Sequence, residues 1–407
     1  MDTSLTWLYE AEQIYRRKTG QTTWSLSDWH NEPGDVVLPI KMLASLHVDP
    51  NSTMRYYFMD TAHETKKEIS SFYKQHLALN LEVKNLAVCL NGTSALHLLA
   101  RTLSQEGVSR ILVVTPVYFS FLTALTTFGV AITYIHAAFE NQRVGVDVSL
   151  ILDAARNQMV DAIFITNPIF AAGSAIDIGQ LEALAIHADR NGIWLILDET
   201  LAGLPWAPDQ QRPFAPRGLR LVSEYERCIY LWSVGKSLFI NGIKHTLLFA
   251  PAPIVTKVER SADSSVGSFT VHQIRLVEEV YNVGNMSEIQ SCVSQNVKRF
   301  KAAYDLCAAS ILDSSLTLTK VDAGFHAIAF LEKTGGDSSQ KKAREVAARI
   351  IVEHGISLIP LAHFGFPPFA PIGYRINLSK HPSKLEKGLS ILVKLANEYP
   401  DLANQLQ

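Results

Sequence analysis

The sequence predicts an α/β protein: a large domain built on a mostly parallel, doubly wound sheet, with a smaller α+β domain. Three observations predict this fold class. From about residue 81 to 250, short β-branched runs alternate with amphipathic helical stretches, the pattern of a parallel sheet with helices on both faces. After Pro251, two long helical stretches and scattered strands replace that alternation. The length of 407 residues also suits two domains better than one.

Each element of the large domain follows from its own run of residues. Strands are expected where short apolar, often β-branched runs occur, at residues 86–90, 111–115, 132–136, 162–166, 193–198, 229–233 and 246–250. Helices are expected where apolar residues recur with helical spacing, at residues 94–103, 119–128, 148–157 and 178–191. Ligands of such sheets bind at the carboxyl ends of the strands, so the residues just after each strand form the candidate site.

The remainder of the chain indicates a smaller α+β domain that the N-terminus joins. Helices are expected at 269–312 (in two stretches), 339–354 and 382–398, and strands at 316–320, 326–331, 356–359 and 375–378. We expect residues 1–45 to form an N-terminal segment joining the small domain, 46–285 the large ligand-binding domain, and 286–407 the small C-terminal domain. The N-terminal segment contains two tryptophans, Trp24 and Trp29, to which the sequence assigns no function.

Composition and charge argue against several classes of protein. Apolar residues make up 47% of the chain and charged residues 19%, as in soluble globular proteins. The net charge of −2, with scattered lysines and arginines, predicts neither a nucleic-acid nor a membrane partner. No apolar run approaches a membrane span, and the N-terminus has no apolar signal core. The four cysteines form no CxxC pair and no metal-ligand spacing with histidine, so we expect a cytoplasmic protein without a metal.

Small polar and aromatic residues follow the first strands of the predicted sheet. The stretch 91–94 (Asn-Gly-Thr-Ser) opens a helix, so its backbone N–H groups can cradle a phosphate, although a plain helix cap is the alternative. Tyr118 lies just beyond a strand, where it can stack on a planar ring or simply fill the core. Asn167 precedes a proline at the end of a strand, a pair that commonly forms a turn.

Charged residues follow the later strands. Asp198 ends a buried strand, where a carboxylate is costly unless it caps a helix or meets a cation such as a protonated ring nitrogen. Lys236 and Lys244 follow Ser233; a desolvated lysine is the better amine nucleophile, and the second lysine can bind phosphate as a point charge. Arg375 heads a strand of the small domain, where it can clamp a carboxylate or form a surface salt bridge. Each residue has an ordinary structural explanation, but their order and shared location favour one ligand site.

With these residues in this order, the chain resembles the fold-type-I pyridoxal-phosphate family, specifically its class I/II aminotransferase-like group, over about residues 50–398. NGTSAL is similar to the family's phosphate loop, PVYFSF to its ring-stacking stretch, ILDE to the strand of the pyridinium-binding aspartate, SVGK to its lysine motif, and YRINLS to the stretch of its carboxylate-binding arginine. The resemblance implies pyridoxal 5'-phosphate as the cofactor, joined to Lys236 as a Schiff base. It implies a substrate-carboxylate contact from Arg375 and cofactor contacts from Gly92, Thr93, Ser94, Tyr118, Asn167, Asp198, Ser233 and Lys244.

The resemblance also implies a homodimer, in which Tyr56 matches a tyrosine that reaches the phosphate of the partner's site. Two departures from the family pattern stand out. The family's second asparagine and a tyrosine, which both donate to the cofactor's ring oxygen, are replaced by Phe170 and Leu201. Asn167 lies at the family's first asparagine, so the ring-oxygen role is not carried over to it. Without those donors we expect the imine at Lys236 to stay protonated to higher pH. The second departure is Lys244, which stands where the family has an arginine, so cofactor affinity is expected to differ.

Three functions follow as hypotheses from this pattern. The first is an aminotransferase-type enzyme acting on an α-amino acid, with Lys236 as general base at Cα. The second is a specialised reaction of a biosynthetic pathway: β- or γ-elimination or replacement, cyclisation, decarboxylation or an oxidase-type reaction. The third is a catalytically silent binding protein, which the retention of Asp198, Lys236 and Arg375 argues against. We also predict that the aromatic loop 363–371 shapes side-chain specificity, through Phe364 or Phe366.

Overall fold

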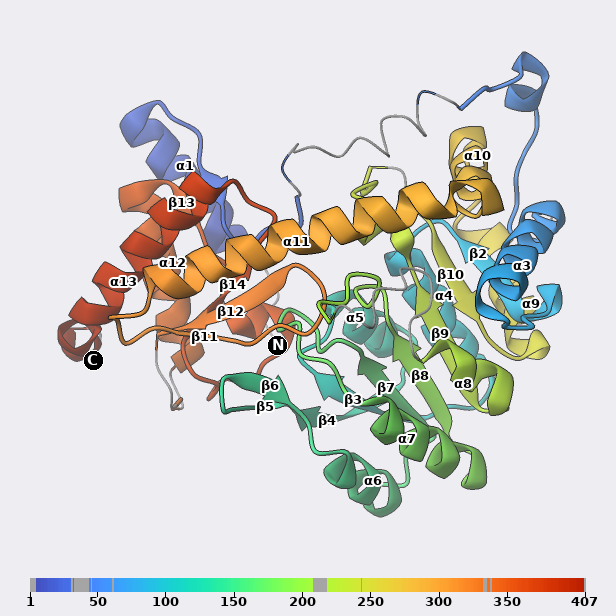
Figure 1. Cartoon of the computed structure of the whole chain (residues 1–407). Coiled ribbons are helices and arrows are strands. Elements are labelled where there is room, and N and C mark those ends of the chain that lie inside the picture. Colours follow the sequence, from blue (N-terminus) through green and yellow to red (C-terminus); the bar gives the residue numbers. More distant parts are fainter. Residues whose placement is uncertain are drawn as a thin grey trace.

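The computed structural model confirms the predicted α/β fold with a mostly parallel central sheet (Figure 1). It describes residues 5–30, 32, 44, 46–60, 62–207, 218–242, 244–331, 335–336 and 339–405. The predicted segment boundary at residue 45 lies outside the described residues, and the division of the chain into three segments stays a prediction. Within the described residues, no helix is long and apolar enough to cross a membrane.

The central sheet has seven strands in the order β2-β10-β9-β8-β7-β3-β4. These strands are β2 (Leu86–Cys89), β3 (Arg110–Thr115), β4 (Ala131–His136), β7 (Ala162–Thr166), β8 (Trp194–Asp198), β9 (Cys228–Trp232) and β10 (Thr246–Phe249). Five neighbouring strands, from β9 to β4, run parallel, whereas β10 is antiparallel to both of its neighbours. Every residue of β2, β7, β9 and β10 is buried, which explains their uninterrupted apolar sequences. All seven predicted strands of the large domain are confirmed.

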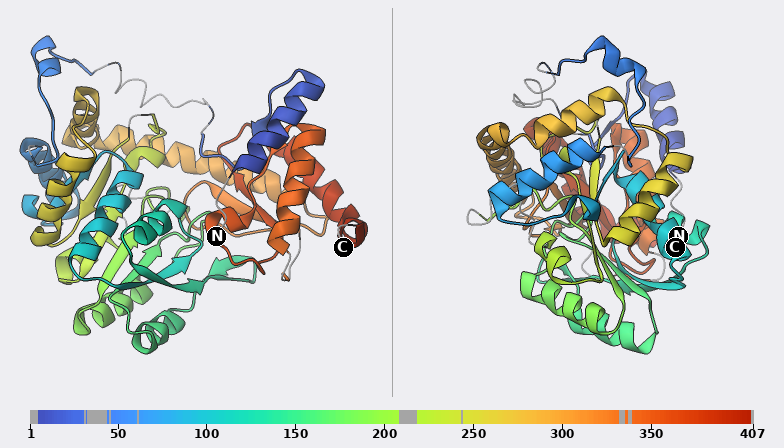
Figure 2. Two further views of the ribbon diagram at one scale, coloured as in Figure 1. Left: turned by 180° about the vertical axis from the view of Figure 1, so that it is seen from behind. Right: turned by 90° about the vertical axis from the view of Figure 1, so that its right-hand side faces the viewer.

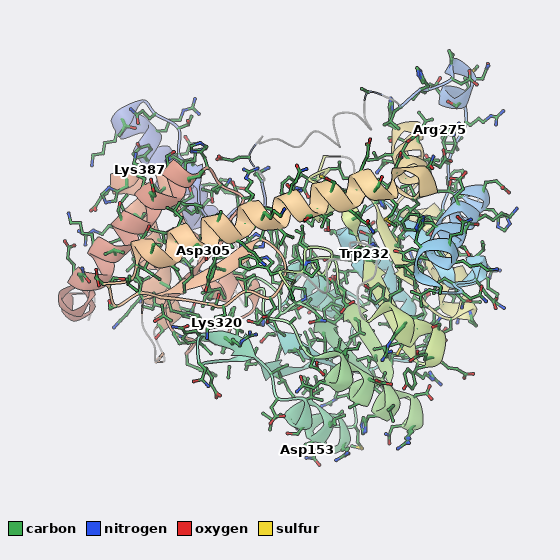
Figure 3. All side chains as sticks on the ribbon, in the orientation of Figure 1. Asp153, Trp232, Arg275, Asp305, Lys320 and Lys387 are labelled. Carbon is green, nitrogen blue, oxygen red and sulfur yellow. The ribbon has the colours of Figure 1, made fainter. Side chains whose placement is uncertain are left out.

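Helices cover both faces of this sheet, as Figure 2 shows: α6, α7 and α8 lie on one side, and α4 and α5 on the other. The helices of this part are α3 (His63–Leu77), α4 (Gly92–Gln105), α5 (Phe119–Thr127), α6 (Val148–Asn157), α7 (Ile178–Arg190), α8 (Leu219–Glu224), α9 (Ala252–Ser265) and α10 (Val271–Val280). The core between the layers includes Trp232 at the end of β9, which is fully buried and lies in the middle of the molecule (Figure 3).

The second part of the molecule is built on a three-stranded antiparallel sheet in the order β11-β12-β14. Its elements are α11 (Met286–Ser310), β11 (Thr317–Leu318), β12 (His326–Phe330), α12 (Ser339–His354), β13 (Ile356–Ser357), β14 (Gly373–Asn377) and α13 (Pro382–Gln405). Helix α11 spans roughly 37 Å at 1.5 Å per residue, and Figure 1 shows it running between the two parts. The N-terminal elements lie here too: β1 (Trp24–Ser25) pairs with β13, and α1 (Thr6–Thr19) packs on α12.

Several short or weakly patterned elements were not predicted. Helix α1 buries only Leu8, Ala11 and Tyr15, a stripe too narrow to stand out in a polar sequence. The hairpin of β5 (Ala138–Glu140) and β6 (Arg143–Gly145) has three residues in each strand, too few for a visible alternation. Single 3-10 turns were not predicted either: η1 (Pro50–Met54), η2 (Val83–Asn85), η4 (Val234–Lys236), η5 (Val283–Asn285) and η6 (Leu361–Phe364).

Candidate active site

A cavity of about 230 Å³ lies where β8 and β9 end and α4 begins. Most of the predicted site residues line it: Gly92, Thr93, Tyr118, Asp198, Ser233, Lys236 and Lys244. Ser94, Asn167, Arg375 and Tyr56 are not part of its wall. A larger groove of about 750 Å³ borders other residues of the sheet region, among them Asn80, Trp194 and Arg227, and contains none of the predicted site residues. The smaller cavity is therefore the candidate site.

The first turn of α4 forms one end of the cavity. Asn91 caps this helix: its side chain accepts from the N–H of Ser94 at 2.9 Å, and the Ser94 hydroxyl accepts from the N–H of Asn91 at 3.1 Å. The structural alternative therefore accounts for the Ser94 hydroxyl. The N–H groups of Gly92 and Thr93, at the start of the helix, have no helical partner to accept them. This turn presents free donors and the positive end of the helix dipole to the cavity, as an anion site requires.

Asp198 brings a buried carboxylate to the cavity from the end of β8. Its side chain accepts from the N–H of Thr200 at 3.1 Å, and it forms no ion pair with any described residue. Burial raises the pKa of Asp198, and the hydrogen bonds from Thr200 offset only part of that effect. A buried acid without a cation is costly, so this position favours a ligand that carries a protonated nitrogen.

Lys236 ends the turn η4, directly after β9, and points into the same cavity. Its amine makes no ion pair with any described residue. Burial, together with the smaller effect of the like charges of Lys244 and Arg375, lowers the pKa of Lys236 to about 8. About one tenth of the amine is therefore uncharged at pH 7, far more than for an ordinary lysine, and this is the form in which a lysine attacks a carbonyl.

Arg375 lies on β14, fully buried, next to the cavity rather than on its wall. Its Nε donates to the carbonyl of Ser27 at 3.0 Å, and its Nη2 donates to the same oxygen. The guanidinium carbon lies 3.8 Å from the ring centroid of Trp29 and 4.3 Å from that of Phe364. Nη1 has no hydrogen-bond partner within the described structure. Burial lowers the pKa of Arg375 to about 9, which leaves it charged at neutral pH with donors to spare.

Asn167 has a structural role in this fold. Its side-chain amide donates to Glu199 at 2.7 Å, and its side-chain oxygen accepts from the N–H of Ile176 at 2.8 Å. Glu199, which the sequence did not single out with a function of its own, also accepts from the Tyr230 hydroxyl at 3.0 Å. Asn167 therefore braces the strand ends below the cavity, which favours the structural interpretation over a cofactor contact.

Tyr56 does not line the cavity that the other predicted site residues share. It follows η1, is 79% exposed and stacks on Phe58 with ring centroids 5.7 Å apart. In both views of Figure 2 the short helix near residue 50 projects from the body of the molecule. Within one chain, Tyr56 thus faces solvent instead of the cavity.

Aromatic and aliphatic side chains that the motifs did not predict as ligands complete the wall: Trp29, Leu96, Phe170 and Leu201. Phe170 packs on Trp29 and Tyr118, with centroid distances of 5.4 and 5.9 Å. Phe170 and Leu201, which stand where the family has polar donors, therefore make the cavity apolar at this place. Sequence reasoning missed Trp29, and no local signal marked it, because its contacts come from residues more than a hundred positions away.

The phenylalanine side chains of the loop 363–371 lie in two different environments. Phe364 packs on Arg375 and lies 6.0 Å from Phe170 between ring centroids. Phe366 and Phe369 instead line a separate apolar cavity of about 200 Å³, together with Phe139 and Phe330. Only Phe364 therefore belongs to the neighbourhood of the candidate site.

Nothing in the described residues suggests a metal: they contain no group of three or more histidine, cysteine, aspartate or glutamate side chains that could hold one. His326 lies near the site but is a buried side chain whose ring packs edge-on against Trp29 at 4.8 Å. Burial and the nearby charges of Arg375 and Lys236 hold the pKa of His326 well below its ordinary value, so it is neutral.

Comparison with known proteins gives one consistent result. Residues 21–392 match the family described as aminotransferase class I and II. The chain is 22% identical over 293 residues to 1-aminocyclopropane-1-carboxylate synthase 3 of Solanum lycopersicum, a match that covers 69% of this chain and 61% of that protein.

Solved structures show the same fold at low sequence identity. An aspartate aminotransferase double mutant of Thermus thermophilus has a TM-score of 0.80 at 17% identity, with 97% of each chain covered. An Escherichia coli protein with an identified methionine aminotransferase function has a TM-score of 0.77 at 16% identity, covering 97% of this chain and 98% of that one. N-succinyldiaminopimelate aminotransferase of Mycobacterium tuberculosis has a TM-score of 0.75 at 16% identity, covering 95% and 97%.

Proposed function

The chain belongs to the aminotransferase class I and II family of pyridoxal-phosphate-dependent enzymes, and from this premise we propose that it transfers the amino group of an α-amino acid, with Lys236 as the catalytic residue. The observation that carries the proposal is the pairing of a buried, unpaired acid with a depressed-pKa lysine on one cavity. Those two groups stand at the ends of adjacent parallel strands, β8 and β9.

The cavity fits pyridoxal 5'-phosphate on several independent counts. The turn at Gly92 and Thr93 offers backbone donors to a phosphate, and Lys244 adds a positive charge beside it. Asp198 lacks a cation and suits a protonated ring nitrogen. The Ser233 hydroxyl donates to the carbonyl of His245 at 2.9 Å, so it must rotate before it can donate to a phosphate.

When bound, the cofactor supplies an electron sink that acidifies the Cα–H bond of the amino acid. The residues of the chain would do the rest. Asp198 would keep a proton on the ring nitrogen, and Tyr118 would pack against the ring. Lys236 would hold the cofactor through its Nζ, and the same amine would take and return the proton at the substrate Cα. Arg375 holds the α-carboxylate with the donors that Ser27 leaves unused.

The decisive experiment follows the visible absorption of the protein with added pyridoxal phosphate during titration with single L-amino acids, without a keto acid. We expect a band that one class of amino acid shifts and that a 2-oxo acid restores. The Lys236→Ala variant should show no such band. A wild-type protein that binds no cofactor at all would overturn the proposal.

A second candidate function is a specialised reaction, such as cyclisation or elimination. Two observations favour it as an alternative to transamination: Phe170 and Leu201 line the cavity where polar donors were expected, and one relative is named 1-aminocyclopropane-1-carboxylate synthase 3. The same titration separates the candidates, because a specialised enzyme would form product continuously without any 2-oxo acid.

We further propose that the enzyme is a homodimer in which Tyr56 completes the partner's site. Tyr56 and Met54 lie on a projecting segment and are 79% and 75% exposed. Large apolar side chains that are exposed in a single chain are typical of an interface with a partner. A mixture of the inactive variants Lys236→Ala and Tyr56→Ala tests this, because a mixed dimer contains one site with both residues intact. Activity regained on mixing supports a shared site; additive residual activities argue against one.

A further inference from the structure

Trp29 contacts two cations, to which the proposed function assigns the α-carboxylate and the α-amine of the substrate. Its ring centroid lies 3.8 Å from the guanidinium carbon of Arg375 and 5.0 Å from Nζ of Lys236. The ring also lines the cavity and packs on Phe170. No motif assigned this residue, and the function described above does not use it.

The backbone next to Trp29 is tied to β14 and the turn after it. The Ser27 hydroxyl donates to the carbonyl of Arg375 at 2.5 Å, and Arg375 donates back to the carbonyl of Ser27. Asn377 donates to the carbonyl of Asp28 at 3.2 Å, and Lys380 pairs with the Asp28 carboxylate at 2.8 Å. Trp29 is thus anchored to the strand that carries Arg375, and its ring has a fixed place against the guanidinium.

The guanidinium of Arg375 is left with one open edge. Trp29 and Phe364 lie against the guanidinium, and the Ser27 carbonyl takes the Nε edge. Nη1, which has no partner in the described structure, remains for a carboxylate. In an α-amino acid the carboxylate and the amine sit on the same carbon, so a substrate held by Arg375 and reacting at Lys236 must lie against Trp29.

The charges on the cavity wall indicate which substrate side chains the cavity can accept. Among the described residues on that wall, Lys236 and Lys244 are the cations, and the proposed function assigns both to the cofactor. His245 is also on the wall, but burial lowers its pKa to about 4, so it is neutral. Within one chain, the described part of this wall therefore offers no free cation to a second carboxylate of an acidic substrate, whereas Trp29 and Phe170 offer planar apolar surface.

We infer that Trp29 is a specificity-determining residue that contacts the substrate and selects amino acids with planar, apolar side chains over acidic ones. The inference rests on the proposed function, because it takes Arg375 as the carboxylate site and Lys236 as the reacting amine. It goes beyond that function by naming the class of substrate and the residue that chooses it.

The test measures equilibrium binding of two unreactive carboxylates to the protein loaded with pyridoxal phosphate, by calorimetry. One is 3-phenylpropanoate, which is phenylalanine without its amine, and the other is succinate, which is aspartate without its amine. We expect the wild type to prefer 3-phenylpropanoate and Trp29→Ala to reduce that preference about 10-fold, as expected for loss of stacking on a partly buried ring. Trp29→Phe should restore most of the preference.

Trp24→Phe is the matched control, since Trp24 lies in the same segment but is not on the cavity wall, and its ring centroid lies 5.9 Å from Nζ of Lys384. It should leave the preference unchanged. Equal weakening of both ligands by Trp29→Ala, or no change, overturns the inference; if that variant fails to fold, Trp29→Leu replaces it. Failure of the proposed function looks different, because the wild type would then show no visible band with the cofactor.

Discussion

The two ends of the cavity differ in the proportion of ionisable and apolar side chains on their walls. At the cofactor end, Asp198, Lys236 and Lys244 bring three ionisable groups to the ends of β8, β9 and the start of β10, next to the open donors of α4. At the substrate end, Trp29, Phe170 and Leu201 form an apolar wall, and the buried guanidinium of Arg375 lies against two aromatic rings.

This difference indicates that different parts of the chain bind the cofactor and select the substrate. The cofactor end is made by residues directly after parallel strands, positions that the sheet brings together in any protein of this fold. The substrate end is made by the N-terminal segment, the loops after β7 and β8, and the loop before β14. Substitutions at the first end should therefore abolish activity, and those at the second should change which substrate is used.

The largest effect should come from Lys236→Ala, which removes the reacting amine. We expect kcat to fall by about 10³- to 10⁴-fold and the visible band of the cofactor to vanish, as absorption spectra and initial rates would show. Lys387→Ala is the control, since that lysine is exposed on α13, far from the cavity (Figure 3). If the Lys236→Ala variant kept the visible band, Lys236 would not hold the cofactor, and the distinction between a cofactor end and a substrate end would fail.

Asp198→Asn should lower kcat by about 10²-fold or more, because a neutral amide no longer stabilises a protonated ring nitrogen. Without cofactor, the same variant should be more stable than the wild type. Burial raises the pKa of Asp198, so the folded protein binds a proton more readily than the unfolded chain, and stability falls as pH rises from 3.8 through the raised pKa.

Thermal melts of the cofactor-free proteins across pH check the sign of this second effect. The melting temperature of Asp198→Asn should exceed that of the wild type above the raised pKa, and the difference should disappear below pH 3.8. Asp305→Asn, at an exposed position of α11 (Figure 3), should show no such pH-dependent gain. Equal melting temperatures at every pH would mean that the carboxylate has a compensating partner.

Phe364→Leu and Phe366→Leu form a matched pair at the substrate end. Both rings are buried, with exposed fractions of 2% and 4%, so both variants should lose comparable stability. Only Phe364 touches Arg375, at 4.3 Å, and only its replacement should change the relative kcat/KM for different amino acids, by about 3- to 10-fold. If both variants shift the relative rates, the apolar cavity behind Phe366 takes part in selection as well.

The smallest effect is expected from Phe170→Asn, which places an amide donor on the wall beside Tyr118. If the missing ring-oxygen donors keep the bound Lys236 nitrogen protonated to higher pH, the new amide should move the midpoint of the visible pH titration downward. Phe170→Leu keeps the wall apolar and should leave the midpoint in place. A midpoint already well below neutral pH in the wild type would contradict the expectation.

Local sequence predicted the strands and the chemistry at their ends because both depend on short stretches. The run Trp194–Asp198 is buried throughout most of its length, so its apolar character is visible without any partner. Asp198 and Lys236 were found because a charge after a buried strand has few explanations. Asn167 shows the limit of that reasoning: its place at a strand end was correct, but the direction of its side chain depends on Glu199, 32 residues away.

The sequence by itself determined the fold class, the seven strands of the main sheet and the candidate residues that follow them. Tertiary structure alone decided that Trp29 covers Arg375, that Ser27 occupies one edge of the guanidinium, and that Phe364 but not Phe366 approaches the site. The physical reason is sequence separation. A strand signals its own burial through its residues, whereas Ser27 and Arg375, separated by 348 positions, meet only because β1 and β14 belong to the same folded unit.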